Sequence, residues 1–380
     1  MGAVMRQGIY INNLSGELAY KSFRPASLPP EPAVAVESGT DTPLLKAHLA
    51  LSKLKGSAEF VPNINLYLSM YIRKEALFSS QLEGTQCTFD DIFDPRMPEN
   101  IAHEVADVAN YVKATEYAIA RMEELPLCNR LFRETHEVLM SGVRGQEKYP
   151  GQFRVSQNWI GPVSCGLSRA LFIPPNVEDM NDAMNDLENF INTEDDLDPL
   201  VKAALIHYQF ETIHPFLDGN GRVGRLLITL FLLHEKIIDA PIIYPSLELK
   251  LNQTDYYYRL TGVRAKGDYE SWVEFFLDCL QKSATDSFES IARLSRLSTG
   301  TREAVSRIKK PERALRLLEY LERQPIVDIA SVATELGVAR ATAVGIIDDF
   351  VEAGILKQSA GNLRYRVYSY EPYLEILRGD

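Results

Sequence analysis

The stretch His214-Pro215-Phe216-Leu217-Asp218-Gly219-Asn220-Gly221-Arg222-Val223-Gly224-Arg225 combines a titratable base, a carboxylate, a glycine-rich turn and two guanidinium groups within twelve residues. Residues 219–221 are small or tolerate left-handed backbone, so their consecutive N–H groups can face one anion. Two arginines begin the helix expected next, whose N-terminus favours phosphate. A purely structural turn would need neither the aspartate nor both arginines. The set predicts phosphoryl chemistry.

This loop is not a Walker loop, although its glycine spacing superficially resembles one. The lysine and the metal-binding Ser or Thr of a Walker loop are both absent. The preceding residues 200–213 carry Ala204, His207, Tyr208 and Phe210 at helical rather than strand spacing. We therefore expect the loop to join two helices. His207 shares a helix face with His214, but no further ligand supports a metal pair, so a structural role is expected for it.

The stretch resembles the signature of the Fic family, H-P-F-x-D/E-G-N-G-R-x-x-R, at every fixed position. The resemblance implies a mainly α fold, a helical bundle with a β-hairpin flap. It also implies transfer of AMP from ATP to a Ser, Thr or Tyr hydroxyl of a target protein. It assigns His214 as the general base and Asp218 as the Mg²⁺ ligand. The nucleotide would be bound by Gly219, Asn220, Gly221, Arg222, Gly224 and Arg225.

A second pattern lies far upstream, where Ser79 is followed by Glu83 and Gly84. Taken alone, Ser and Glu four residues apart are typical of a solvated helix. Beside the first motif, the pattern resembles the inhibitory helix of Fic proteins. The resemblance implies that Glu83 pairs with Arg225 and takes the space that the γ-phosphate needs. An apolar stripe, formed by Leu68, Tyr71, Ile72 and Ala76, predicts that residues 65–80 form a helix docked on the catalytic bundle.

Residues 151–175 contain two short apolar runs, Val155 to Ile160 and Ala170 to Ile173, separated by Gly161, Pro162 and Gly166. This pattern predicts a hairpin with a long loop. Its position resembles the Fic flap, which holds a target segment as an added strand. An ordinary surface hairpin is the alternative. The nucleoside pocket is less clearly marked: the family resemblance points to Asn252 and Tyr257, whereas aromatic residues at helical spacing are more often core.

Composition indicates a globular chain. Its 380 residues are 46% apolar, enough for two or three domains, and no apolar run reaches the length of a membrane span. Four cysteines without close pairing or metal-ligand spacing, together with the lack of a signal-peptide core, predict reduced thiols and a cytoplasmic location. The net charge of −12 argues against nonspecific binding to nucleic acid or membrane.

Much of this charge lies between Glu178 and Asp198, which hold nine acidic residues and no basic one. Apolar residues recur there at helical spacing, so the acids are expected to form the solvated face of an amphipathic helix rather than a metal site. The apolar positions are Met180, Met184, Leu187 and Ile191.

Three regions are expected along the chain. Residues 1–110 would hold an irregular, proline-rich arm and the inhibitory helices, residues 111–298 the catalytic domain, and residues 311–380 a separate module behind a linker that is helical in part. The module pattern predicts helices at residues 314–321, 329–336 and 341–352 and a β-hairpin wing with strands at 356–357 and 365–368. It resembles a small α+β winged helix-turn-helix domain.

DNA binding by this module is not favoured. Residues 311–380 carry eight basic and eleven acidic residues, and the helix that would enter the groove sets Arg340 against Asp348, Asp349 and Glu352. A protein contact or a homodimer fits this charge better, although Arg340, Arg364 and Arg366 would suit a small basic patch.

Three functions are compatible with the sequence. The first is a protein adenylyltransferase, with ATP as the substrate, Mg²⁺ as the metal and self-modification as an option. The second is an enzyme that removes AMP, with Glu83 orienting water. The third is a transcriptional regulator that senses nucleotide. The intact His214, Asp218 and Arg225 favour an enzyme, because a sensor needs the phosphate cradle but no base.

Overall fold

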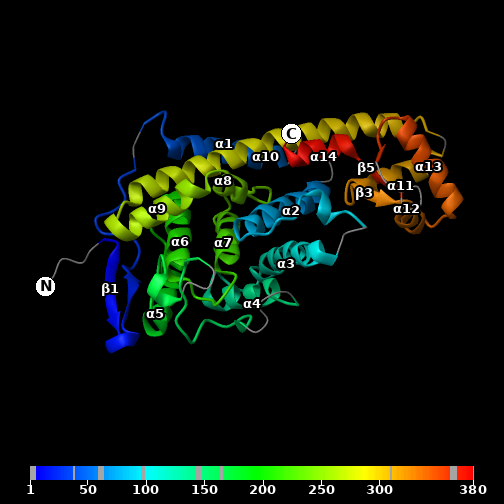
Figure 1. Cartoon of the computed structure of the whole chain (residues 1–380). Coiled ribbons are helices and arrows are strands. Elements are labelled where there is room, and N and C mark those ends of the chain that lie inside the picture. The colour runs from blue at the N-terminus through cyan, green and yellow to red at the C-terminus, as the bar shows by residue number, and fades with distance from the viewer. Residues whose placement is uncertain are drawn as a thin grey trace.

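The computed structural model describes residues 6–36, 39–58, 64–95, 99–142, 148–162, 166–308, 310–359 and 366–379. Helices dominate these residues, and the only strands among them form two small sheets. The longest helix, α10 (Tyr269–Val305), runs along the catalytic bundle to the C-terminal domain (Figure 1). The mainly α prediction is therefore confirmed.

Two buried helices, α6 (Pro199–Ile213) and α7 (Asn220–His234), form the centre of the bundle. The Asp198 side chain accepts a hydrogen bond from the Leu200 N–H, which caps α6, and Pro199 occupies its first turn. Both helices are apolar on most sides, as expected for helices enclosed by others. They pack against each other, so the loop between them is fixed at both ends.

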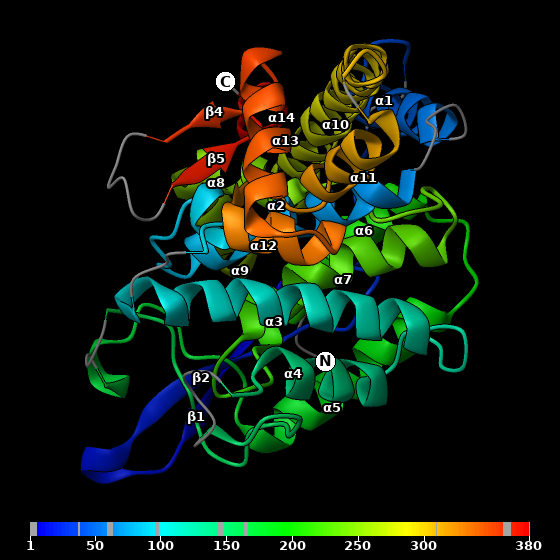
Figure 2. The ribbon, with the colours of Figure 1, turned by 90° about the vertical axis from the view of Figure 1, so that its right-hand side faces the viewer.

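The other helices of the bundle surround this pair. Helix α2 packs between α3 and α8 and also contacts α7, while α1 lies along α10. Figure 2 shows α3 and α4 side by side below the C-terminal helices. The bounds are α1 (Pro43–Ala58), α2 (Ile64–Leu82), α3 (Glu99–Arg121), α4 (Asn129–Leu139), α5 (Val177–Asn192), α8 (Pro245–Leu251) and α9 (Gln253–Lys266), with short 3-10 turns η1 (Gly16–Leu18), η2 (Asp90–Ile92) and η4 (Leu167–Arg169).

Two predicted amphipathic helices are confirmed. Helix α2 buries Tyr71, Ile72 and Ala76 against the bundle. Helix α5 is capped by the Asn176 side chain, and its acidic face lies opposite the buried Met180, Met184, Leu187 and Ile191. Helix α3 is continuous across residues 110 and 111, where a boundary between two regions was expected. Helix α10 continues to Val305, so part of the predicted linker is helical.

The prediction of an irregular N-terminal arm is wrong. Residues of this arm form an antiparallel hairpin of β1 (Gly8–Asn13) and β2 (Tyr20–Pro25). The hairpin depends on distant partners: the Phe23 N–H donates to the Ile173 carbonyl, and the Phe23 ring contacts Phe172. The prolines of the arm lie at the last residue of β2, Pro25, and beyond it at positions 29, 30 and 32, where the chain leaves the hairpin.

The predicted flap is a hairpin held by one bridge rather than by two regular strands. Ile160 and Phe172 form an antiparallel bridge, and residues 163–165 lie outside the described part. The base of the flap instead bonds to the catalytic loop: the Arg154 N–H donates to the Pro215 carbonyl over 2.9 Å. Polar contacts to the loop thus take the place of further strand pairing.

The C-terminal domain has the predicted three helices, α11 (Pro311–Leu321), α12 (Ile329–Leu336) and α13 (Arg340–Glu352). Asp328 and Ser331 form a capping box at the start of α12, and Gly337, with a φ of 64°, ends this helix. The wing strands are β4 (Lys357–Gln358) and β5 (Val367–Ser369), and residues 360–365, including Arg364, lie outside the described part. Two elements were not predicted: β3 (Ile326–Asp328), which pairs with β5, and helix α14 (Glu371–Arg378).

This domain is attached to the catalytic bundle by polar contacts. The Gln324 side chain donates to the Phe93 carbonyl, and the Tyr370 and Thr301 hydroxyls share a hydrogen bond. Arg378 pairs with Asp90 of η2. The contacts to Phe93 and Asp90 place the domain on the segment that follows α2.

No single helix among those described is long and apolar enough to cross a membrane; α12 and α13 would meet these criteria only together, as a pair bent by 107°. Three cysteines, Cys87, Cys128 and Cys279, are buried free thiols, and Cys165 lies outside the described residues.

Candidate active site

The loop between α6 and α7 turns sharply at two residues. His214 ends α6 with left-handed backbone, φ 52°, and Gly219 precedes α7 with φ 76°. Asn220 holds the turn closed, because its side chain accepts from the Phe216 N–H and donates to the Phe216 carbonyl, both over 2.8 Å. The Asn220 side chain is thus committed to the loop itself. Backbone N–H groups of the first turn of α7 are left for an anion.

His214 is partly buried, and its Nδ1 atom is enclosed without a hydrogen-bond partner. Burial lowers the pKa of its imidazole to about 4, although the Glu83 carboxylate acts in the opposite direction. The imidazole is therefore neutral near pH 7 and able to accept a proton. Its backbone carbonyl accepts hydrogen bonds from the Asn158 side chain over 3.0 Å and from Arg154 Nε over 3.1 Å. Residues at the base of the flap thus fix the backbone of His214.

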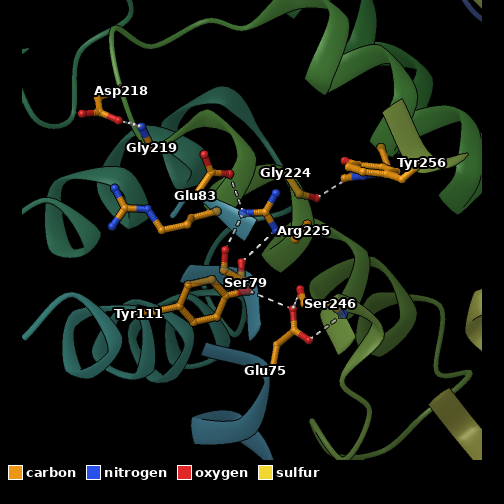
Figure 3. Close-up of polar contacts among 12 residues, drawn as sticks. Glu75, Ser79, Glu83, Tyr111, Asp218, Gly219, Gly224, Arg225, Ser246 and Tyr256 are labelled. Atoms are coloured by element: carbon orange, nitrogen blue, oxygen red, sulfur yellow. Dashed lines mark hydrogen bonds and ion pairs between the residues drawn. The ribbon is translucent and has the colours of Figure 1, made fainter. Parts of the chain in front are cut away.

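Arg225 is held by Ser79 of α2 and by Glu83, which directly follows this helix (Figure 3). Its Nε donates to the Ser79 hydroxyl over 2.9 Å, and one Nη donates to the Ser79 carbonyl and to Glu83 Oε1, over 2.9 and 2.7 Å. Burial would lower the pKa of Arg225, but the Glu83 carboxylate more than offsets this and raises it. The predicted contact between Glu83 and Arg225 is present.

The Glu83 carboxylate also lies against the N-terminus of α7. A Cβ added to Gly221 would fall 2.2 Å from Glu83 Oε1 and 2.8 Å from an Arg225 Nη. Gly221 therefore lets the carboxylate approach the backbone closely. An anionic group of this chain thus occupies the place where the cradle is suited to bind phosphate.

A buried network behind Ser79 ties α2 to α8 (Figure 3). Glu75 accepts hydrogen bonds from the Ser246 N–H over 3.0 Å and from the Tyr111 hydroxyl over 3.3 Å. Burial raises the pKa of Glu75 to about 7, and the bonds from Ser246 oppose that rise. Helix α2 is therefore held at Glu75 as well as near its end at Ser79.

Asp218 lies at the mouth of the site. Its carboxylate accepts a hydrogen bond from the Gly219 N–H and pairs with Lys148 Nζ over 2.8 Å. Burial would raise the pKa of Asp218, but Lys148 and the Gly219 N–H outweigh it and hold the pKa below its usual value. An open cavity extends from here, with Arg222 and Glu83 among the residues that line it. The ionised carboxylate is suited to a hard cation.

The other predicted nucleotide contacts are placed as follows. The Gly224 carbonyl accepts a hydrogen bond from His207 Nδ1 over 2.9 Å, and the side chain of Asn252 donates to the Glu248 carbonyl. Tyr257 is half exposed; burial and then the charge of Glu83 raise its pKa, so it lies within electrostatic reach of the Glu83 carboxylate. His207 is buried between Gly224 and Tyr256, in agreement with a structural role.

Sequence reasoning missed several residues of the site. Glu211 lies three residues before His214, is 7% exposed, and its Oε1 has no hydrogen-bond partner. A Cβ on Gly224 would fall 2.3 Å from this oxygen, so a larger residue at 224 would require the Glu211 carboxylate to move. Burial raises the pKa of Glu211 to about 7, and Arg225 opposes the rise. A carboxylate in an otherwise apolar helix was the available signal. Arg154 and Asn158, which bond to the His214 carbonyl, were less clearly marked in the sequence than Glu211.

Comparisons with known proteins agree with this site. Residues 126–232 match the Fic/DOC family, residues 42–120 match the Fic/DOC family N-terminal region, and residues 311–360 match the IclR helix-turn-helix domain. The chain is 30% identical to protein adenylyltransferase Fic of Drosophila willistoni over 173 residues, 43% of this chain and 32% of that relative. For the Drosophila melanogaster protein of the same name, the identity is 30% over 183 residues, which are 45% of this chain and 34% of that relative.

The chain spans about a third of the length of these curated relatives. Among solved structures, it resembles a Fic family protein from Desulfovibrio desulfuricans, with 21% identity, a TM-score of 0.53, and coverage of 88% of this chain and 98% of that one. It also resembles a Fic domain containing signaling protein from Bacteroides thetaiotaomicron, with 20% identity, a TM-score of 0.51, and coverage of 66% of this chain and 97% of that one. These two likenesses concern the fold. The two family matches and the complete motif at residues 214–225 lead to one conclusion: residues 42–120 and 126–232 of this chain belong to the Fic family.

Proposed function

We propose that this protein transfers AMP from ATP to a hydroxyl side chain of a protein substrate. The observation that carries the proposal is the neutral, partly buried imidazole of His214 beside an anion cradle built from the N-terminus of α7 and the buried Arg225. The relatives named protein adenylyltransferase support it. ATP is then the donor and pyrophosphate the product that leaves.

The proposed reaction is a single displacement at the α-phosphorus. The hydroxyl oxygen of the target forms a bond to this phosphorus while its bond to the bridging oxygen of pyrophosphate breaks. His214 accepts the hydroxyl proton, because the neutral imidazole has a free lone pair. The first-turn N–H groups of α7 and the Arg222 and Arg225 guanidiniums stabilise the negative charge that builds on the phosphates.

Asp218 is the residue suited to hold Mg²⁺. Its carboxylate is ionised and open to the cavity, and Mg²⁺ commonly uses one or two protein carboxylates together with phosphate oxygens and water. The described residues contain no group of three or more His, Cys, Asp or Glu that would bind a metal alone. When bound, the cation would neutralise phosphate charge; the roles of His214 and Arg225 do not depend on it.

The proposal includes autoinhibition by Glu83. Its carboxylate neutralises Arg225 and lies against Gly221, where a phosphate group would otherwise bind. ATP and Glu83 would therefore compete for the same positive site. The Ser79 contacts and the Glu75 network hold the helix that delivers Glu83.

The test is incubation of the Glu83→Gly protein with labelled ATP and Mg²⁺, with and without a His214→Ala change. Transfer of AMP to the protein itself or to an added partner, lost in the double variant, is the expected result. No transfer in either variant would contradict the proposal. Release of AMP from a modified protein that requires Glu83 would favour the AMP-removing reaction instead.

The C-terminal domain is proposed to contact protein rather than DNA. Asp348, Asp349 and Glu352 lie on α13, the helix that would enter a DNA groove, with Arg340 at its start. The expected cytoplasmic location and homodimer remain predictions. Binding of DNA by the His214→Ala protein would favour the alternative function, a transcriptional regulator that senses nucleotide.

A further inference from the structure

His136 lies outside the motif, on α4, yet it supports the centre of the catalytic loop. The imidazole is 1% exposed and stacks on the Phe216 ring, with 3.8 Å between centroids and 4° between planes. It lies between two segments that are far apart in sequence, the base of the flap at Gly151 and the loop at Asp218.

The hydrogen bonds of His136 determine where its proton is. The Gly151 N–H donates to Nδ1 over 2.9 Å, so Nδ1 must be the acceptor nitrogen. The ring proton is then on Nε2, which lies 3.0 Å from the Asp218 carbonyl oxygen and donates to it. A doubly protonated ring would have no lone pair for Gly151. One tautomer therefore satisfies both neighbours.

The loop passes directly over this ring. A Cβ added to Gly219 would fall 3.0 Å from Met140 Sδ and 3.3 Å from His136 Nε2. Because a peptide unit is planar, holding the Asp218 carbonyl also sets the direction of the Gly219 N–H. This N–H donates to Asp218 Oδ1 over 2.7 Å. A chain of contacts thus runs from His136 through one peptide plane to the carboxylate.

We propose that His136 is a positioning residue: its Nε2–H holds the Asp218–Gly219 peptide so that the Asp218 carboxylate and the N–H groups of the cradle face Mg²⁺ and phosphate. The proposal rests on the proposed function for its ligand, a magnesium nucleotide. The geometry of the loop, however, can be measured without any ligand.

Three variants in the Glu83→Gly background separate the contributions of the ring. His136→Phe keeps the stacking on Phe216 and loses both hydrogen bonds. His136→Gln places an amide donor near the position of Nε2, and His136→Asn places an acceptor near that of Nδ1. We expect Phe and Asn to weaken binding of a non-hydrolysable ATP analogue with Mg²⁺ at least tenfold and to raise the Mg²⁺ concentration at half-saturation. Gln should stay within about threefold of the parent, since its amide keeps a donor to the Asp218 carbonyl.

Hydrogen exchange of peptides covering residues 216–222 gives the readout that needs no nucleotide. We expect faster exchange than in the parent for His136→Phe and His136→Asn, and parent-like exchange for His136→Gln. Parent-like exchange and binding in His136→Phe would overturn the proposal. Equal losses in all three variants, in step with a lower Tm, would assign His136 a merely structural role and also overturn it. If the parent binds no nucleotide, the proposed function fails, while exchange still decides the role of His136.

Discussion

Arg378, near the end of the chain, donates hydrogen bonds to both carboxylate oxygens of Asp90, which lies shortly after Glu83 in the sequence. The same guanidinium pairs with Glu371. The C-terminal helix α14 is thereby tied to the segment that follows Glu83, the residue proposed to inhibit the site. Gln324 reinforces the connection through the Phe93 carbonyl.

The Arg378→Gln change should loosen this tie. We expect AMP transfer by the otherwise unchanged protein to rise about two- to fivefold, because partly exposed ion pairs contribute roughly 1 kcal/mol or less. Radiolabel incorporation measures it. Arg313→Gln, at an exposed arginine at the start of the same domain, is the control. Asp90→Asn should have the same effect, and the double variant should add little; fully additive effects would show that the two residues act separately.

Removing the inhibitory carboxylate should have a larger effect. Glu83→Gly frees Arg225 and the space beside Gly221 for phosphate, so AMP transfer should increase at least tenfold, about 1.4 kcal/mol. Mass spectrometry of the purified protein after exposure to ATP and Mg²⁺ measures the added AMP. Glu123→Gly is a matched control, because Glu123 is also an exposed glutamate in a turn after a helix. Equal incorporation by both variants would remove the inhibitory role.

Glu211 should make stability depend on pH. Its pKa is raised from 4.5 to about 7, so the folded state binds more protons than the unfolded state between these values. This contribution to stability is present below about pH 4.5 and is lost as pH rises toward 7. Glu211→Gln does not titrate, so its free energy of unfolding should gain on the wild type by up to about 3 kcal/mol across this range.

Urea denaturation at pH 5, 6, 7 and 8 tests this expectation. Glu178→Gln, at an exposed position of α5, supplies the control with no change expected. A constant difference between Glu211→Gln and wild type at all four pH values would contradict the assignment of a buried titrating carboxyl.

Lys148 should compete with Mg²⁺ for Asp218. Its ammonium lies 2.8 Å from the carboxylate, so a cation that binds there must displace it. Lys148→Gln in the Glu83→Gly background should lower the Mg²⁺ concentration at half-saturation of nucleotide binding at least twofold. Mn²⁺ titration followed by electron paramagnetic resonance gives an independent measure. Lys113→Gln, an exposed lysine on α3, is the control; an unchanged or higher metal requirement would show that Lys148 assists rather than competes.

The features that the sequence predicted best are local. The turn between α6 and α7 depends on neighbouring residues, such as Gly219 with its positive φ, and the helices of the C-terminal domain follow their apolar spacing. The contact between Glu83 and Arg225 was predicted from a resemblance rather than from spacing, because the two residues are 142 positions apart. The inhibitory effect of this contact remains a prediction.

The features that were missed depend on distant partners. The β1–β2 hairpin is held through Phe23 by the flap, and nothing near Phe23 in the sequence indicates that contact. His136 gave no signal either, since its partners Gly151 and Asp218 lie 15 and 82 residues away. Sequence periodicity reports which face of a helix is buried. Periodicity does not indicate which polar group of another segment contacts that buried face.

Helix α10 has a mechanical consequence. A helix of this length extends about 55 Å, and α10 passes from the bundle into contact with α11 and α14 without a break. A rigid rod shared by two domains cannot act as a swivel. An antibody fragment or a second copy bound at the C-terminal end of α10 would therefore also restrain the helical bundle. Any reorientation of the C-terminal domain would require α10 to bend.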